Sequence, residues 1–185
     1  MTIPDGDRAG TRFTMSSIGH VRTGYRTVAD TPVQTGLNRD ATGVVVIDPQ
    51  FVAGLDGLAR FDFAWVLTFL HLDRAEPDPI DALRPTPFLA LDPSLQVGVF
   101  ATRYPVRPNP IGLSLVRIEH VEGNEISFTG VDLTDGTPVL DIKPWVPNFD
   151  LPHDGLVDRA GDVAIGWYSD SLLDRRESPD LPPSP

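Results

Sequence analysis

The sequence contains no cysteine and no long apolar stretch. The lack of cysteine excludes disulfide bonds and thiolate metal sites, and no other residues show the spacing of a metal-ligand cluster. No window approaches the apolar length that a membrane-spanning helix needs, and residues 1–7 lack the basic-then-apolar pattern of a secretion signal. We therefore expect a cytoplasmic protein with no metal ion and no membrane partner.

Basic residues are also scarce. The chain has 15 lysines and arginines against 26 acidic residues, a formal net charge of −11, and Lys143 is its only lysine. Such a chain repels a polyanion on average, because proteins that hold nucleic acid usually neutralise several phosphates with a basic face. Net charge does not fix how charges are distributed, so a local basic patch can still form. Its candidate members are Arg22, Arg26, Arg103, Arg107, Arg117 and Lys143.

The motifs of common nucleotide-binding and metalloenzyme folds are missing as well: there is no GxGxxG, no P-loop and no HExxH. The 185 residues instead contain short β-prone segments separated by turn residues. The expected strands cover 18–28, 43–47, 61–71, 113–121, 126–129 and 137–142, and a short helix begins at Asp48-Pro49. This pattern predicts a single mainly β domain, a small barrel or a sandwich, with one or two short helices.

Both ends of the chain differ in composition from its middle. Residues 1–13 are polar and contain glycine, so we expect a flexible arm before a domain at 14–150. Residues 72–95 are rich in Asp and Pro and have the length of a lid or binding loop. In the extension at 151–185, residues 163–168 could add an edge strand and 169–176 a helical segment, and the proline-rich end should be extended or disordered.

One loop is unusually constrained. Residues 98–114 read GVFATRYPVRPNPIGLS, a short apolar run, a loop with three prolines and a second apolar run. This pattern predicts strand, rigid loop, strand, because proline fixes φ and biases the residue before it toward extended geometry. Such a loop can hold Thr102, Arg103, Arg107 and Asn109 in place, and Gly112 permits close backbone approach where the next strand begins.

The stretch GVFATRYPVRPNPIGLS, followed at 132–145 by DLTDGTPVLDIKPW, resembles the TsaA-like or TrmO family of S-adenosylmethionine-dependent tRNA methyltransferases. Weaker similarity extends over about residues 16–150. The resemblance implies a small β-barrel, a homodimer and a cofactor bound near the subunit interface. It also implies methylation of the N6 nitrogen of threonylcarbamoyladenosine next to the tRNA anticodon.

The resemblance further implies which loops contact S-adenosylmethionine. Their candidate cofactor-binding residues are Gln34, His71, Thr102, Arg103, Leu113, Thr134, Asp135, Gly136 and Thr137. Where the family carries Arg-Gln-Pro, this chain has Val33-Gln34-Thr35. Arg103 could neutralise the cofactor's carboxylate or orient the acceptor, and Asp132 and Asp135 could balance its cation or bind its hydroxyls.

Methyl transfer depends mainly on holding the donor and acceptor in line, but an amine acceptor must also lose a proton. No single residue stands out as the base. The candidate catalytic residues are His71, Arg103 and Asp141.

Two other functions stay open on the sequence. The first is an S-adenosylmethionine-dependent enzyme that acts on a small molecule or on the cofactor itself. Three features favour it: the acidic charge, Val33, and the departure from Pro147 onward from tRNA enzymes with an additional C-terminal domain. The second is a non-catalytic module that binds S-adenosylmethionine, which the intact loop motifs disfavour.

Overall fold

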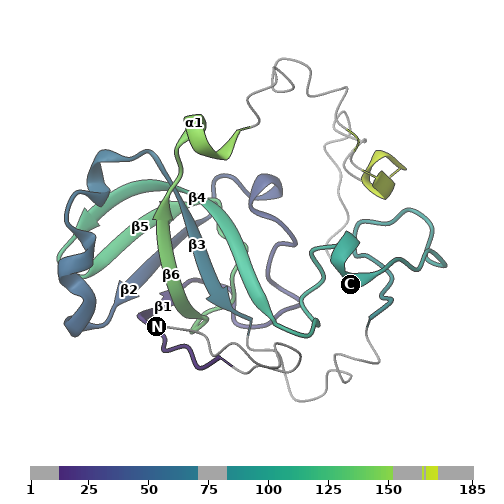
Figure 1. Cartoon of the computed structure of the whole chain (residues 1–185), viewed down its shortest axis with the longest axis horizontal. Coiled ribbons are helices and arrows are strands. Elements are labelled where there is room, and N and C mark those ends of the chain that lie inside the picture. The colour runs from purple at the N-terminus through teal and green to yellow at the C-terminus, as the bar shows by residue number, and fades with distance from the viewer. Residues whose placement is uncertain (1–12, 71–82, 152–163, 165, 171–185) are drawn as a thin grey trace, which may run out of the picture.

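A computed structural model describes residues 13–70, 83–151, 164 and 166–170, and their strands form a closed antiparallel barrel (Figure 1). The strand order around the barrel is β1-β2-β5-β4-β3-β6. The strands are β1 (Gly19–Arg22), β2 (Thr42–Ile47), β3 (Phe63–Phe69), β4 (Ile111–Glu122), β5 (Glu125–Thr129) and β6 (Pro138–Pro144). The prediction of a mainly β, barrel-like domain is confirmed.

Alternation of side chains along the strands fills the barrel. On β2, β3 and β5 the buried side chains recur at every second position, as expected for strands with one face turned to a core. The ring of Phe128 is fully buried opposite Gly43, and a Cβ atom at Gly43 would come within 2.6 Å of the ring's Cζ atom. Near the start of β4, however, the inward positions hold Gly112 and Ser114, and Thr68 faces them from β3.

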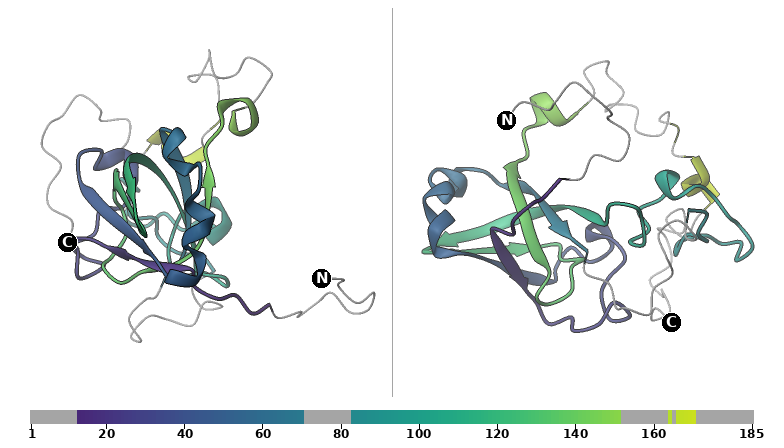
Figure 2. Two further views of the ribbon diagram at one scale, coloured as in Figure 1. Left: turned by 90° about the vertical axis from the view of Figure 1, so that its left-hand side faces the viewer. Right: turned by 60° about the horizontal axis from the view of Figure 1, so that its bottom comes forward.

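The barrel has two different ends. Each strand runs in the opposite direction to the next strand in the sequence. The connections β1–β2, β3–β4 and β5–β6 therefore lie at one end of the barrel. The β3–β4 connection, of which residues 83–110 are described, extends beyond this end (Figure 2). At the other end lie the 3-10 helices η2 (Pro49–Leu55) and η3 (Leu58–Arg60), where Leu58 is buried in the core. The expected short helix at Asp48-Pro49 is therefore present as a 3-10 helix.

Three predicted strands are shorter or absent. The strand expected at 61–71 is β3, which covers only Phe63–Phe69 of the described residues. Residues 99–101 form a 3-10 turn, η4 (Val99–Ala101), because the N–H groups of Ala101 and Thr102 donate to the carbonyls of Gly98 and Val99 rather than to a neighbouring strand. The first strand ends at Arg22, because the next N–H, of Thr23, donates to the carboxylate of Asp135 at 3.0 Å.

The remaining short elements are η1 (Thr35–Leu37), α1 (Pro147–Asp150) and η6 (Gly166–Asp170). Residues 166–168 of the predicted edge strand belong to η6, so that prediction is wrong for them. The expected arm at 1–13 and most of the 151–185 extension lie outside the described residues. No helix in the described ranges is long and apolar enough to cross a membrane.

Candidate functional site

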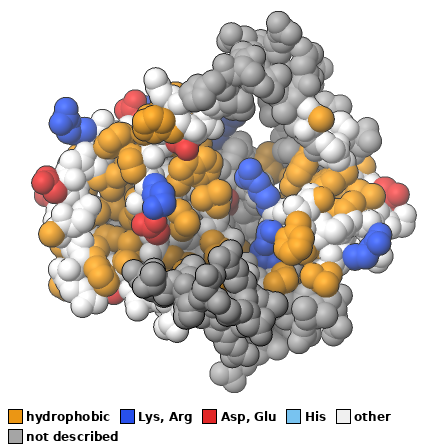
Figure 3. Space-filling view, viewed as in Figure 1, with side chains coloured by type: hydrophobic (Ala, Val, Ile, Leu, Met, Phe, Trp, Pro, Cys, Tyr) orange, Lys and Arg blue, Asp and Glu red, His pale blue; other side chains and the backbone are white. Residues whose placement is uncertain are grey.

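A cavity of about 1100 Å³ opens at the barrel end where the three connections meet. Its lining comes from within residues 25–38, 87–89, 100–114 and 132–137, together with Leu70, Trp167 and Tyr168. Figure 3 shows the hollow between the barrel and the β3–β4 connection, with basic side chains at its edge. The volume slightly exceeds the roughly 300–1,000 Å³ typical of small-molecule sites, so the cavity has room for a ligand and part of a second molecule.

The charges on the cavity wall balance, in contrast to the acidic chain. Among the described residues that line it, Arg103 and Arg107 are basic and Asp30 and Asp132 are acidic. Asp30 is exposed and accepts a hydrogen bond from the Thr27 hydroxyl at 2.6 Å. The local field at the cavity therefore lacks the strong negative sign that the net charge of −11 suggests.

Aromatic side chains form two pairs on the cavity wall. The rings of Phe88 and Tyr104 lie 4.9 Å apart between centroids, and Trp167 stacks on Tyr168 at 3.9 Å. The indole Nε1 of Trp167 donates to the carbonyl of Ala101 at 2.8 Å, which links η6 to the end of η4. Planar, apolar surfaces of this kind stack well against a nucleobase.

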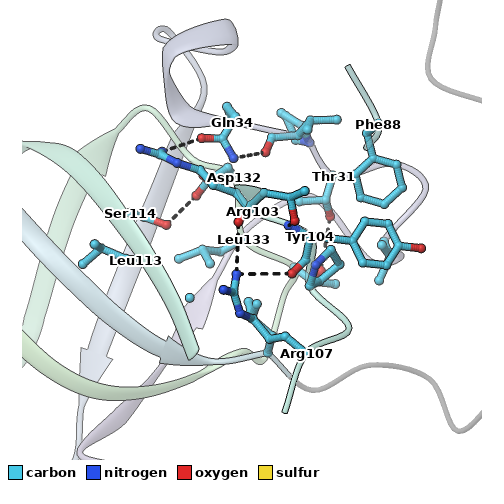
Figure 4. Close-up of a pocket in the computed structure, with 18 of the residues that line it drawn as sticks. Thr31, Gln34, Phe88, Arg103, Tyr104, Arg107, Leu113, Ser114, Asp132 and Leu133 are labelled. Carbon is cyan, nitrogen blue, oxygen red and sulfur yellow. Dashed lines mark hydrogen bonds between the residues drawn. The ribbon is translucent and has the colours of Figure 1, made fainter. Parts of the chain in front are cut away.

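Asp132 lies just beyond the end of β5, and its carboxylate contacts Ser114 (Figure 4). The Ser114 hydroxyl donates to its Oδ1 atom at 2.6 Å, and the Thr35 backbone N–H donates to its Oδ2 atom at 3.2 Å. Burial raises the pKa of Asp132 from 3.8 to about 6, while these two hydrogen bonds and the nearby Arg103 charge act in the opposite direction.

Arg103 connects this carboxylate to the β1–β2 connection. Its Nη1 atom donates to the side-chain oxygen of Gln34 at 2.6 Å, and the Gln34 amide nitrogen donates to the carbonyl of Val33 at 2.7 Å. Gln34, Arg103, Asp132 and Ser114 thus lie together on one wall (Figure 4). The site joins side chains from all three connections and from β4.

Hydrogen bonds fix the proline-rich loop that carries Arg103. The buried Thr102 hydroxyl donates to the carbonyl of Val99 at 2.8 Å and accepts from the backbone N–H of Tyr104 at 3.0 Å. The Nη1 atom of Arg107 is 3.4 Å from the carbonyl oxygen of Thr102 and 3.5 Å from that of Tyr104. The predicted rigid mount for side chains is therefore held by these contacts as well as by its prolines.

The structure brings most of the predicted cofactor-binding residues to this cavity. Six of them line it: Gln34, Thr102, Arg103, Leu113, Thr134 and Thr137. Asp135 and Gly136 are not among the lining residues and instead close the β5–β6 turn onto β1. The Asp135 carboxylate accepts from Thr23, and Gly136, at φ 78°, donates its N–H to the carbonyl of Val21 at 2.8 Å.

The candidate bases are placed differently. Asp141 lies on β6, away from the residues that line the cavity, and pairs with Lys143 at 2.7 Å. His71 lies outside the described residues. The sequence reasoning did not single out Ser114, although a polar residue at an inward position of β4, between Gly112 and Val116, was a usable signal. Among the described residues, no group of three or more histidines and carboxylates could hold a metal ion.

Comparison with known proteins relates this chain to a family. The family model described as tRNA-methyltransferase O N-terminal domain matches residues 20–151. A probable S-adenosyl-L-methionine-binding protein of Pyrococcus abyssi is 37% identical over 155 residues, 84% of this chain and 76% of the relative. A mouse tRNA (adenine(37)-N6)-methyltransferase is 38% identical over 106 residues, 54% of this chain and 22% of the mouse protein.

A solved structure agrees with the sequence matches. The crystal structure of TrmO from Pseudomonas aeruginosa superposes with a TM-score of 0.61 at 38% identity, covering 78% of this chain and 60% of that one. This chain therefore spans less than two thirds of the solved protein. The matched range contains the barrel except Gly19 at the start of β1, and it contains the three connections that build the cavity. The chain belongs to the TrmO family of S-adenosylmethionine-dependent methyltransferases.

Proposed function

We propose that this protein transfers a methyl group from S-adenosylmethionine to the N6 nitrogen of threonylcarbamoyladenosine in tRNA. The observation that carries the proposal is that Arg103 of the 98–114 stretch and Asp132 of the 132–145 stretch line the same cavity, where the charge of Arg103 acts on the Asp132 carboxylate. The name of the mouse relative, which specifies N6 of adenine 37 in tRNA, supports the same atom as the acceptor.

The side chains on the cavity wall fit this cofactor. S-adenosylmethionine carries a carboxylate, a positively charged sulfur and an adenosine, and when bound it supplies an electrophilic methyl group. Arg103 can pair with a carboxylate, and Asp132 supplies a negative charge or a hydroxyl acceptor. The aromatic pairs Phe88–Tyr104 and Trp167–Tyr168 offer surfaces against which adenine can stack.

The protein's own contribution is largely positioning. The loop around Arg103 is fixed by prolines and by the Thr102 and Arg107 hydrogen bonds, and Gln34 holds the guanidinium from the opposite connection. Because these groups are already ordered, little entropy is lost in orienting the two reactants at the moment of reaction. This positioning can supply a large share of the rate enhancement.

A small-molecule acceptor is the second candidate, and the net charge of −11 favours it because tRNA is a polyanion. Arg103 and Arg107 at the cavity make the local surface more favourable for phosphate than the chain as a whole. The two candidates differ in their response to salt, since binding of tRNA releases counterions and binding of a neutral small molecule does not.

The direct test is transfer of labelled methyl to tRNA that carries threonylcarbamoyladenosine. We expect labelling of this tRNA and none of the same tRNA without the modification, with a steep fall in activity between low and moderate salt.

Arg107→Ala should weaken tRNA binding and give a shallower salt dependence. If a known tRNA enzyme labels the substrate while this protein binds the cofactor but transfers nothing, the small-molecule acceptor replaces tRNA.

We also propose that the protein acts as a homodimer. The cavity is lined by three exposed apolar side chains, those of Phe88 (54% exposed), Leu113 (55%) and Phe100 (80%), and a second subunit over the cavity would bury them.

Light scattering at micromolar concentration with cofactor should give a dimer mass, and Phe100→Glu should shift it toward the monomer. The matched control is Phe149→Glu in α1, which is 83% exposed but does not line the cavity. A monomer mass for the wild type would contradict the proposal.

A further inference from the structure

The Asp132 carboxylate keeps hydrogen-bonding capacity that its protein partners do not use. A carboxylate has about four acceptor positions. Ser114 and Thr35 occupy one on each oxygen, and the backbone N–H of Asp132 itself takes up part of a third. Because Asp132 lines the cavity, the remaining positions can receive a proton from a bound molecule. The other lining carboxylate, Asp30, is exposed at the rim, and Asp141 is paired with Lys143 away from the cavity.

We propose that Asp132 is the general base that takes the proton from the acceptor nitrogen, with Ser114 as the residue that positions it. This inference rests on the proposed function, because it requires an N–H acceptor. The nitrogen gives its proton to a carboxylate oxygen of Asp132 and keeps the electron pair of the N–H bond. With that pair it bonds to the methyl carbon, and the electrons of the broken carbon–sulfur bond stay on sulfur. Asp132 then releases the proton to solvent.

The electrostatic surroundings suit this role. With a pKa of about 6, Asp132 is mostly ionised at pH 7, yet it is a stronger base than an ordinary aspartate. Arg103 is the charged group that faces it, and after the hydrogen bonds its charge adds a smaller contribution that favours the ionised form against the effect of burial. The remaining contacts are uncharged: the Ser114 hydroxyl on β4, the N–H of Thr35 at the start of η1, and the backbone N–H of Asp132 itself.

The Ser114 bond gives the inference a second, independent signature. Donation from Ser114 lowers the pKa of Asp132, so Ser114→Ala should raise that pKa. The acidic limb of the kcat profile should consequently move to higher pH. A hydroxyl that served only to stabilise the fold would lower stability without moving this limb.

The experiment compares Asp132→Asn with a matched carboxylate. Asn keeps the shape of Asp, its oxygen can accept from Thr35, and its NH₂ group can donate to the Ser114 oxygen, so the variant is expected to fold. The control is Asp92→Asn, because Asp92 also accepts from a serine hydroxyl and a backbone N–H but is exposed and away from the cavity. The two readouts are kcat for methyl transfer and the affinity for S-adenosylhomocysteine by calorimetry.

We expect Asp132→Asn to lower kcat by about 100-fold or more, within the range measured for general bases, with S-adenosylhomocysteine affinity changed less than about threefold. Asp92→Asn should behave as the wild type in both. Wild-type transfer with a kcat loss below about threefold in Asp132→Asn would overturn the inference alone. So would a loss explained entirely by weaker cofactor binding, which would make Asp132 a ligand of the cofactor. No wild-type transfer overturns the proposed function first, and with it the acceptor that this inference requires.

Discussion

At pH 7, Asp132→Asn is expected to raise the free energy of unfolding by about 2–3 kcal/mol. The folded-state pKa of Asp132 is about 6, against 3.8 for the free side chain. Between these values the folded chain binds more protons than the unfolded chain, so stability falls as the pH rises from about 4 to 6. Above pH 6 the full cost of ionising a buried carboxylate is present, and a neutral amide of the same shape avoids it.

Chemical denaturation at several pH values checks this expectation. The difference between variant and wild type should be largest above pH 6 and should shrink as the pH approaches 4, where Asp132 is protonated in the folded state. In Asp92 the hydrogen bonds from Ser94 lower the pKa, so Asp92→Asn should give no gain in stability at pH 7. A variant that is less stable than the wild type at pH 7 would contradict the buried, ionised carboxylate.

Such a gain would show that the site is maintained at a cost to stability. Stabilising substitutions that reduce activity are common where an active site holds a buried charge. The same variant is expected to lose methyl transfer, so stability and activity should change in opposite directions at one residue. If the Asp132 carboxylate were purely structural, Asp132→Asn would lower stability and activity together.

Gly112→Ala is expected to lower the free energy of unfolding by about 1–3 kcal/mol, the usual cost of overpacking a core. A Cβ atom at residue 112 would overlap the Thr68 hydroxyl oxygen on the neighbouring strand and come within 2.9 Å of Leu70 Cδ2. Thr68 is fully buried, so its short side chain has little space into which to move. In the part of the chain that the structure describes, its hydroxyl has no hydrogen-bond partner.

A double-mutant cycle in urea isolates this contact. Thr68→Ala removes the overlapping oxygen, so the loss on adding Gly112→Ala should be smaller in that background than in the wild type. Gly54→Ala is the control, because a Cβ atom there has no neighbour within 4 Å. Strictly additive losses in the cycle would mean that the cost of Gly112→Ala arises elsewhere.

The sequence by itself determined the local architecture. The sequence predicted the alternation of buried residues along β5 and the turns at Gly123 and at Asp135-Gly136. It could do so because a period of two and a glycine at positive φ depend only on neighbouring residues. The family resemblance at 98–114 and 132–145 identified the loops that line the cavity. Six of the nine cofactor-binding candidates line the cavity, because the strand order puts the loops that carry them at the same end of the barrel.

Only the tertiary structure decided how those loops meet. Arg103 and Gln34 are 69 positions apart, and Ser114 and Asp132 are 18 apart, so no local pattern pairs them. The antiparallel strand directions put the three connections at one end, and closure through β1 and β6 arranges them around one opening, where burial raises the pKa of Asp132. Asp141 pairs with Lys143 on β6 and does not line the cavity. Burial and charge proximity are properties of the assembled barrel, and the choice between Asp132 and Asp141 as a base depends on both.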